Sequence, residues 1–363
     1  MANEIFKCKI CGGQAKWDPE VQKVKCMFCD TEFELNEFET APQTENFEVG
    51  RDAQELGYVE ATDDSSNVRP EDLRVYKCSY CGAEIVTDKT TAATNCVFCN
   101  NPVVIEEQLA TEFKPKWVIP FKINPRDVED MYLKYIKKPF TPDSFLSREH
   151  IQKIKGVYVP FWLYNVDISG RMQAECDNVR RYSDSKYNYT EHKIYDVRRG
   201  GKFKFKKIPV DSSSKTPNDA MDSIEPFNFS EMKAFEMPYL AGFLAERYDE
   251  TQDDCFERAK IRAEKTTTDI LRQSIKGYTS VSVKNSDVTI DNIEAEYVML
   301  PTYLLFCKYN NEDYVFALNG QTGKACGNIP VDKKKIRKFF LSRFIGIWGI
   351  LSAISVLATM ILG

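Results

Sequence analysis

The spacing of apolar residues divides much of the chain into strand-like and helix-like stretches. Residues 117–123 form an apolar run that predicts a buried strand. Asn124 then has the side chain of a helix N-cap, and Pro125 stands at the first helical position. This pattern predicts a helix to about Lys138, where Pro139 stops it.

The apolar period changes to two after Gly156, which ends a second short helix that Ser147 caps. A period of two is typical of strands with one buried face. The runs 186–197 and 202–210 therefore predict a hairpin, with its turn at Arg199-Gly200-Gly201.

The only long helical pattern starts at Thr251, which pairs with Asp254 as a capping box, and ends at Gly277. Two further strand runs follow it, and a hairpin with its turn at Asn319-Gly320 comes after them. The pattern predicts an α+β fold class, with residues 111–332 as a central domain on antiparallel sheet.

The last apolar stretch, residues 344–362, is nineteen residues without a charge. Such a run is long enough to predict a transmembrane helix. Six cations precede it and form a predicted membrane collar: Lys333, Lys334, Lys335, Arg337, Lys338 and Arg343. Because positive residues stay on the cytoplasmic side, the prediction is a single-pass, tail-anchored protein of the cell membrane with its N-terminal bulk in the cytoplasm.

One cysteine pattern occurs twice near the N-terminus. Both copies read C-x2-C-x14-C-x2-C, and the second follows the first after seventy residues. The eight candidate metal ligands are Cys8, Cys11, Cys26, Cys29, Cys78, Cys81, Cys96 and Cys99. Four thiolates in this spacing close a tetrahedral shell, and the short hairpin between the pairs makes each copy a predicted zinc ribbon.

Two structural zinc ions are therefore the expected cofactors, since a shell of four cysteines leaves no open coordination position. A redox dithiol is disfavoured by the two complete quartets, and a disulfide framework by the expected reducing compartment. Iron in the same S4 geometry stays open as an alternative.

Charge is distributed unevenly around these predicted ribbons. Residues 1–115 carry 11 Lys/Arg against 22 Asp/Glu, within a chain of net charge −5. The predicted organisation is zinc ribbon 1 (1–36), an acidic flexible linker (37–73), zinc ribbon 2 (74–110), the α+β domain (111–332), the collar (333–343) and the transmembrane helix (344–362). The acidic ribbon half makes nucleic acid an unlikely partner, because modules that bind nucleic acid need a basic footprint.

A basic stretch in the central domain is the candidate surface for anionic partners. Residues 180–207 hold ten Lys/Arg against three Asp/Glu. The named candidates are Arg180, Arg181, Lys202, Lys204, Lys206 and Lys207. The simpler interpretation is a half-buried strand with one solvated face.

The sequence offers no catalytic pattern. It has two histidines, His150 and His192, and neither stands beside a nucleophile or ligand motif. Phosphate loops, nucleophile elbows and HExxH motifs are absent from the sequence. We therefore expect a protein that is not an enzyme and has no small-molecule substrate.

The chain resembles the bacterial membrane-anchored proteins known as TFIIB-type zinc-ribbon-containing proteins. The resemblance covers nearly the full length, and it rests on the two cysteine quartets and on the stretches 159–164, 245–249, and 300–301 through 317–324. It implies partners among phage-shock-type membrane-remodelling proteins and SPFH/flotillin-like proteins under envelope stress. Only the eight cysteines carry over as site residues.

The leading functional hypothesis is a non-enzymatic, membrane-anchored adaptor or scaffold that recruits protein partners. One alternative is a membrane-tethered nucleic-acid-binding or replication and transcription accessory protein. Another is a sensor of zinc or thiol state that uses the ribbons.

Overall fold

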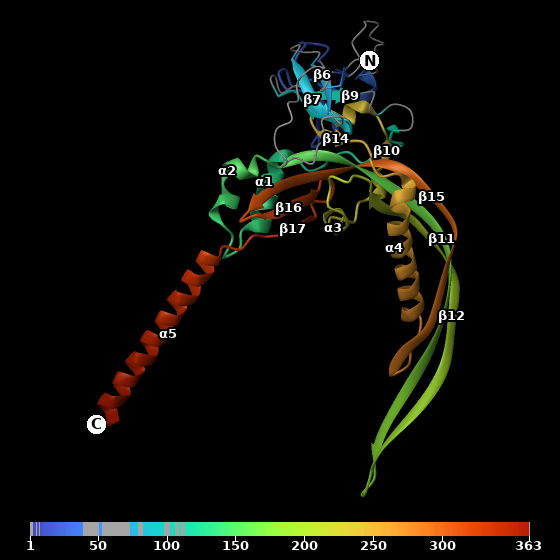
Figure 1. Cartoon of the computed structure of the whole chain (residues 1–363), viewed down its shortest axis with the longest axis vertical. Helices are drawn as coiled ribbons and strands as arrows, with labels where there is room; N and C mark the ends of the chain where they lie inside the picture. The colour runs from blue at the N-terminus through green and yellow to red at the C-terminus, as the bar shows by residue number, and fades with distance from the viewer. Residues whose placement is uncertain are drawn as a thin grey trace.

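The computed structural model describes residues 3–4, 6, 8–38, 51–52, 73–78, 83–97, 102–105, 109 and 113–362. The side chains of residues 3–4, 51–52, 73, 77, 84 and 350–362 are outside the described set. Within these ranges the chain forms one large sheet, two small sheets and a few helices (Figure 1).

The large sheet is mixed, so the predicted antiparallel α+β domain is wrong. It has 11 strands among the described residues, and two of its pairings are parallel: β10 (Trp117–Val118) with β15 (Ser280–Tyr309), and β11 (Lys155–Ser183) with β14 (Leu244–Glu246). The parallel pairs arise because the short strands β10 and β14 each enter the sheet from a connection that crosses over, which a local period of two does not reveal.

Three very long strands form a curved arm that extends from the sheet. β11 has 29 residues, or roughly 95 Å at about 3.3 Å per residue. It pairs antiparallel with β15 on one edge and with β12 (Asn188–Asp211) on the other. Figure 1 shows the three strands bending together along the arm, and only β11 and β12 continue to the tip at the turn between them.

The predicted hairpin turn at residues 199–201 is wrong, because β12 continues through it without a break. Gly200 and Gly201 lie opposite Arg171 and Gly170 of β11. A Cβ atom on Gly170 would lie 2.8 Å from Thr267 and 2.9 Å from Leu271. The missing side chain of Gly170 therefore leaves space for the helix that carries Thr267 and Leu271 to lie close to the sheet. Close approach of another element is a common reason for glycine within a strand. The two predicted strands after Gly277 are likewise one strand, β15.

The helix on the inner side of the arm is α4 (Gln252–Gln273), which lies where the sequence predicts it. Thr251 and Asp254 form the expected capping box. The side chains that α4 buries recur every four residues: Cys255, Ala259, Ala263, Thr267 and Leu271. Small residues at three of these positions let the helix lie close to the strands.

The base of the arm carries the remaining elements of the central region. Three helices are α1 (Pro125–Ile136), α2 (Arg148–Ile151) and α3 (Asn218–Ser223), and three strands are β13 (Lys233–Ala234), β16 (Glu312–Asn319) and β17 (Ala325–Gly327). Asn124 caps α1 and Ser147 caps α2, as predicted.

The first cysteine segment forms a separate sheet of three strands, β2 (Ala15–Asp18), β3 (Lys23–Cys26) and β4 (Glu32–Phe33). The first two of these strands form the hairpin that the sequence predicts between the cysteine pairs. A second small sheet contains β5 (Arg51–Asp52), β6 (Leu73–Lys77) and β7 (Glu84–Asp88).

Part of the second cysteine segment belongs to the large sheet. β8 (Thr91–Asn95) pairs with β14 and with β9 (Pro102–Ile105), and β9 pairs with β1 (Asn3–Glu4). Lys215 reinforces this junction, since its Nζ lies 2.7 Å from Asp88 Oδ2 and 3.4 Å from Glu246 Oε1. The segment is therefore joined to the central region by backbone pairing and by ion pairs.

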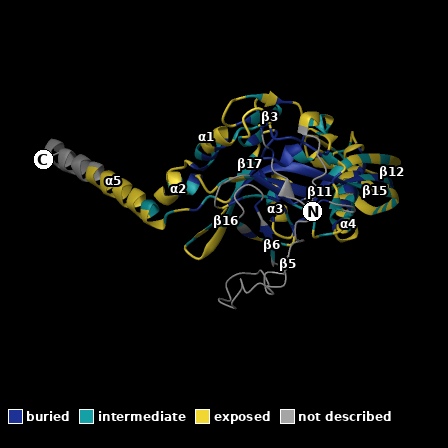
Figure 2. Cartoon of the chain, turned by 90° about the horizontal axis from the view of Figure 1, so that it is seen from above, coloured by how far each residue is buried: buried dark blue, intermediate teal, exposed yellow. Residues whose placement is uncertain are grey.

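The first ribbon shares a hydrophobic core with the large sheet. Its contributors are Phe6, Cys8, Ala15, Trp17, Val24, Cys26 and Phe33. The Trp17 backbone N–H donates to Ala241 O at 3.0 Å, and its ring packs edge-on against Tyr239 at 4.8 Å. Figure 2 shows the buried residues concentrated around this region of the central sheet.

The predicted transmembrane helix over residues 344–362 does not hold. Among the described residues, no helix combines the length and the apolar character needed to cross a membrane. The C-terminal helix α5 (Lys333–Leu362) places six cations in its first eleven positions, and the side chains from residue 350 on lie outside the described set.

The tail-anchored, single-pass localisation depended on that helix and is corrected with it. The collar cations lie on the first turns of α5, where Lys335 Nζ binds Asp143 at 2.7 Å and the Thr141 carbonyl at 2.8 Å. One of the six cations thus joins the helix to the region between α1 and α2.

We predict that Trp17→Ala lowers the free energy of unfolding by about 3–5 kcal/mol, because the side chain is 3% exposed and its loss leaves a cavity between ribbon and sheet. Urea unfolding followed by circular dichroism measures the change. Val21→Ala in the same ribbon is the control: this side chain is 39% exposed, and its change should stay within about 0.5 kcal/mol. Equal effects of the two substitutions would contradict the shared core.

Candidate functional site

The four cysteines of the first ribbon converge on one point. All four Sγ atoms lie within 4.8 Å of one another. The Cys8–Cys29 and Cys11–Cys26 separations are both 3.5 Å. A tetrahedral ion with metal–sulfur distances of about 2.3 Å requires sulfurs about 3.8 Å apart, so the observed separations fit such an ion.

Two similar turns hold these cysteines. The Ile10 N–H donates to Cys8 Sγ and the Phe28 N–H donates to Cys26 Sγ, each at 3.4 Å. The residue after each C-x2-C pair has a positive φ, which is 71° at Gly12 and 55° at Asp30. These left-handed residues turn the backbone back after each C-x2-C pair, and glycine and aspartate tolerate that conformation well.

The thiols have different acidities within the cluster. Hydrogen bonds from Thr31 lower the pKa of the Cys29 thiol to about 6. The backbone of Gly13 lowers the pKa of Cys11, but the neighbouring Cys29 and Cys26 thiols outweigh it and raise that pKa to about 12. Cysteines bind metal as thiolates, so a cation entering this cluster displaces protons.

These four residues can therefore hold a metal ion. Cys8 and Cys26 are buried, whereas Cys11 and Cys29 are exposed. The soft thiolate set suits zinc or iron, and it provides no open position for a substrate.

The second quartet is only partly described. Cys78 and Cys96 are buried, with 0% and 1% exposure, and pack in one cluster with Ile85 and Val103. Cys81 and Cys99 lie outside the described residues. Among the described residues, the first quartet is the metal-binding cluster that the structure brings together.

Three apolar side chains are exposed on the turns that hold the first quartet. Ile10, Met27 and Phe28 are 71%, 61% and 75% exposed, and each occupies an x position of a C-x2-C pair. The ring of Phe28 also lies over Gly13, where a Cβ atom would be 2.5 Å from it. We name these three residues the knuckle patch. The sequence analysis missed it, although apolar residues in a solvent-exposed turn are its signal.

The six candidate cations of the central domain do not form one patch. Lys202, Lys204 and Lys206 lie on the face of β12 that points away from α4, because Phe203 and Phe205 pack toward the helix. Arg180 and Arg181 lie near the tip, roughly 40 Å further along the strand at about 3.3 Å per residue.

The remaining cation, Lys207, instead faces Phe229, with its Nζ 6.0 Å from the ring centre. The lysines therefore fit the simpler interpretation of a solvated face. Lysine on an edge strand also discourages unwanted pairing with other chains.

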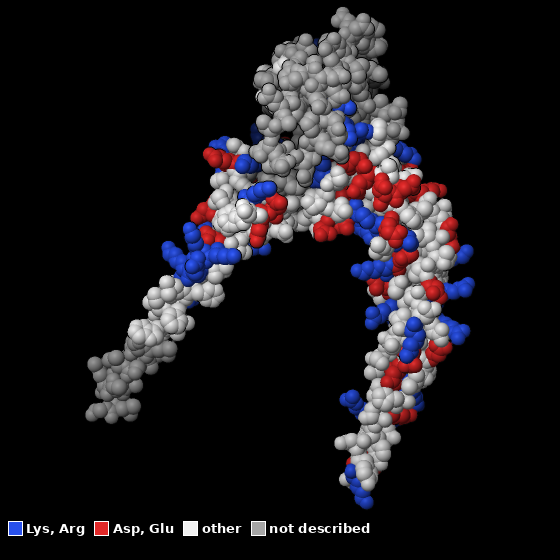
Figure 3. All heavy atoms as spheres, in the orientation of Figure 1, with Lys and Arg blue, Asp and Glu red and all other residues white. Residues whose placement is uncertain are grey.

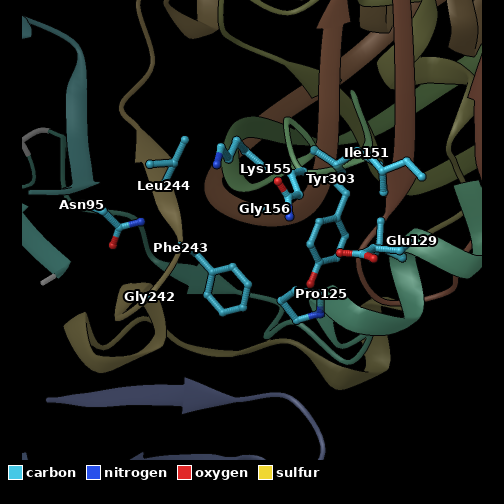
Figure 4. A pocket seen from close by; sticks show the side chains of 13 residues that line it. Asn95, Pro125, Glu129, Ile151, Lys155, Gly156, Gly242, Phe243, Leu244 and Tyr303 are labelled. Carbon is cyan, nitrogen blue, oxygen red and sulfur yellow. The ribbon is translucent and has the colours of Figure 1, made fainter. Parts of the chain in front are cut away.

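A cavity of about 250 Å³ lies between α1, the start of β11 and residues 242–244. Figure 4 shows the rings of Phe243 and Tyr303 near Gly156, with Glu129 on one wall and Lys155 above. The lining includes one carboxylate and one ammonium group but no nucleophile beside a base. We assign no reaction to this cavity.

The two histidines lie in separate surroundings. His150 packs against Phe145 at 4.5 Å, and burial lowers its pKa. His192 Nδ1 lies 2.5 Å from Asp177 Oδ2 across the arm. Neither lies in the cysteine cluster.

No family model matches the chain. No solved structure matches it either. A curated relative is the "Uncharacterized protein YdjG" of Bacillus subtilis (strain 168), which is 34% identical over 238 residues. The aligned region covers 65% of this chain and 70% of that protein.

We predict that Cys26→Ser removes about one equivalent of bound metal per chain, because a shell of four thiolates loses one ligand and its buried anchor. Elemental analysis of the purified protein measures the metal, and the tryptophan fluorescence should change as the shared core around Trp17 loosens. Cys307→Ser is the control, since this cysteine lies outside the cluster. Unchanged metal content in Cys26→Ser would contradict the assignment.

Proposed function

The chain belongs to the same family as YdjG of Bacillus subtilis, and we propose that it is a non-enzymatic adaptor whose metal-bound first ribbon recruits protein partners. The observation that carries the proposal is the knuckle patch. Exposed apolar residues that gather in a patch are a feature of protein contact sites.

The metal would act as a structural element in this function. The closed set of four thiolates favours an ion that holds the two turns in place rather than one that activates water. We propose zinc for this ion, and a second zinc ion for Cys78, Cys81, Cys96 and Cys99. Elemental analysis distinguishes iron from zinc. A ferric thiolate site also absorbs visible light, whereas a zinc thiolate site does not.

The docking of the ribbon supports a recruiting role. Gln22 Nε2 donates to Phe121 O at 2.8 Å, and Asn124 Nδ2 donates to Glu20 Oε1 at 2.8 Å. These contacts hold one side of the ribbon against the base of the arm, while the knuckle patch is exposed. A fixed surface loses less conformational entropy on binding than a tethered one.

The partner class rests on the sequence resemblance. It implies phage-shock-type and SPFH/flotillin-like proteins, and we propose these as the first partners to test. A partner that binds three exposed apolar side chains should present an apolar face of its own.

Thiol or metal sensing is a second candidate function, favoured by the exposure of Cys11 and Cys29. Exposed thiolate ligands are the ones an oxidant reaches first. Metal that stays bound under mild peroxide would exclude this candidate and leave the adaptor proposal in place.

We predict that the triple variant Ile10→Ser, Met27→Ser and Phe28→Ser keeps its metal but loses partner binding. Affinity should fall at least about tenfold, because removing each buried apolar side chain from an interface costs roughly 1 kcal/mol or more. Co-purification identifies the partner, and titration calorimetry with the purified partner measures the affinity.

Val21→Ser is the matched control, because it changes an exposed apolar residue of the same ribbon away from the cysteine turns. A triple variant that holds metal and binds every partner as tightly as the native chain would refute the proposal.

A further inference from the structure

The far end of the arm exposes an aromatic and basic surface that the proposed function does not use. Every residue from 180 to 190 is exposed. The helix α4 ends earlier, where Leu271 and Ile275 pack against Met172, Ala174 and Cys176. The strands therefore continue beyond the helix that covers their inner face.

Three tyrosines gather on that uncovered face. Side chains alternate along a strand, so Tyr182 shares the face of Cys176 and Tyr189 shares that of Val197. Tyr187 lies in the turn just before β12, and its ring contacts that of Tyr189. We name Tyr182, Tyr187 and Tyr189 the tip tyrosines. Their side chains are 51%, 65% and 40% exposed.

The rings of the tip tyrosines are ordered as a stack. Tyr182 and Tyr189 lie 5.1 Å apart with an interplanar angle of 16°, and Tyr187 meets Tyr189 edge-on at 6.3 Å. The Arg180 guanidinium lies 5.6 Å from the centre of the Tyr182 ring. The flat groups are thus arranged before any partner arrives.

The turn at the tip is fixed by Asp184. Its Oδ1 accepts from the backbone N–H groups of Lys186 and Tyr187, each at 2.8 Å, and its Oδ2 accepts from the Tyr189 hydroxyl at 3.0 Å. These hydrogen bonds lower the pKa of Asp184, so it is ionised at neutral pH. The same contacts hold one of the tip tyrosines in place.

The acidic side chains of the tip have polar partners within the chain, whereas three of its basic side chains have no ion pair among the described residues. Asp184 serves the turn, Asp177 contacts His192, and Glu191 contacts Lys193 at 3.5 Å. The cations Arg180, Arg181 and Lys186 have no ion pair with any residue that the structure describes. The charge left for a partner is therefore positive (Figure 3).

We infer that the tip tyrosines and their neighbouring cations bind single-stranded nucleic acid. Exposed rings on a sheet face stack with unpaired bases, and adjacent cations contact the phosphates. The surface lies on the arm, away from the acidic ribbon half that made nucleic acid an unlikely partner in the sequence analysis. It is also separate from the knuckle patch, so the two proposals fail or succeed independently.

We predict that the metal-loaded full chain binds a fluorescein-labelled 20-nucleotide oligo(dT), measured by fluorescence anisotropy at about 50 mM salt. The double variant Tyr182→Ser and Tyr187→Ser should bind about tenfold more weakly or worse, because each stacked base loses its ring. Tyr189 is kept, since its hydroxyl supports the turn.

Ile194→Ser is the matched control. This residue is 67% exposed and lies near the tip but on the opposite face, so its loss should leave the affinity unchanged. A second variant, Arg180→Gln, removes the cation that shares the face of Tyr182 and should reduce the slope of log affinity against log salt by about 0.7, the value for one lost phosphate contact. Unchanged thermal unfolding confirms that the variants fold.

Four outcomes would overturn the inference. The native chain fails to bind oligo(dT), or duplex DNA binds as tightly and ignores the tyrosine substitutions. Equal weakening in Ile194→Ser removes the link to this face. A tip that leaves oligonucleotides unbound, but whose tyrosines are needed to bind a protein, also overturns it and indicates a protein site instead.

Discussion

The pairing of β11 with both of its neighbours is the contact on which the rest of the structure depends. β11 aligns with β15 from Lys155 opposite Leu304 to Asp177 opposite Ser280. Its other edge aligns with β14 at the base and then with β12 to the tip. The base of this strand contributes to the core that the metal ribbon joins, and its far end presents the tip tyrosines.

The cysteine cluster, which could hold a metal ion, and the central sheet share one core. Cys8 and Cys26 contribute to the same core as Trp17 and Tyr158, so an ion held by the thiols also fixes side chains of that core. A small ribbon alone buries too little apolar area to fold stably without metal. Contact with the sheet supplies the missing apolar area, which makes this ribbon an integral part of the base.

The sequence predicts those features whose cause is local. The capping residues Asn124, Ser147 and Thr251 mark three helix starts correctly, because a cap depends on the next few residues. The four cysteines of the first ribbon are likewise identified by their spacing, and the structure brings them together.

The failures concern contacts between distant parts of the chain. Gly200 and Gly201 have the composition of a turn, yet they pair within β12 with Arg171 and Gly170 of β11, a strand that precedes them by about 30 residues. The parallel pairing of β10 with β15, and of β14 with β11, depends on connections that cross over between distant parts of the chain. The sequence shows that the residues of the knuckle patch and the tip tyrosines are apolar or aromatic. It does not show that they are exposed together, because that depends on which other parts of the chain pack over them.

Helix α4 ends before the tip, so it supports only part of the arm. Up to Cys176 the strands pack against the helical segment, whereas beyond Cys176 that segment no longer covers them. From Cys176 to Ser183 the arm extends for roughly 23 Å at about 3.3 Å per residue. A tilt of about 5° where the helix ends would therefore displace the tip by roughly 2 Å, because the displacement grows in proportion to this length. A rotation that is small at the base therefore moves the tip further than it moves the residues beside the helix.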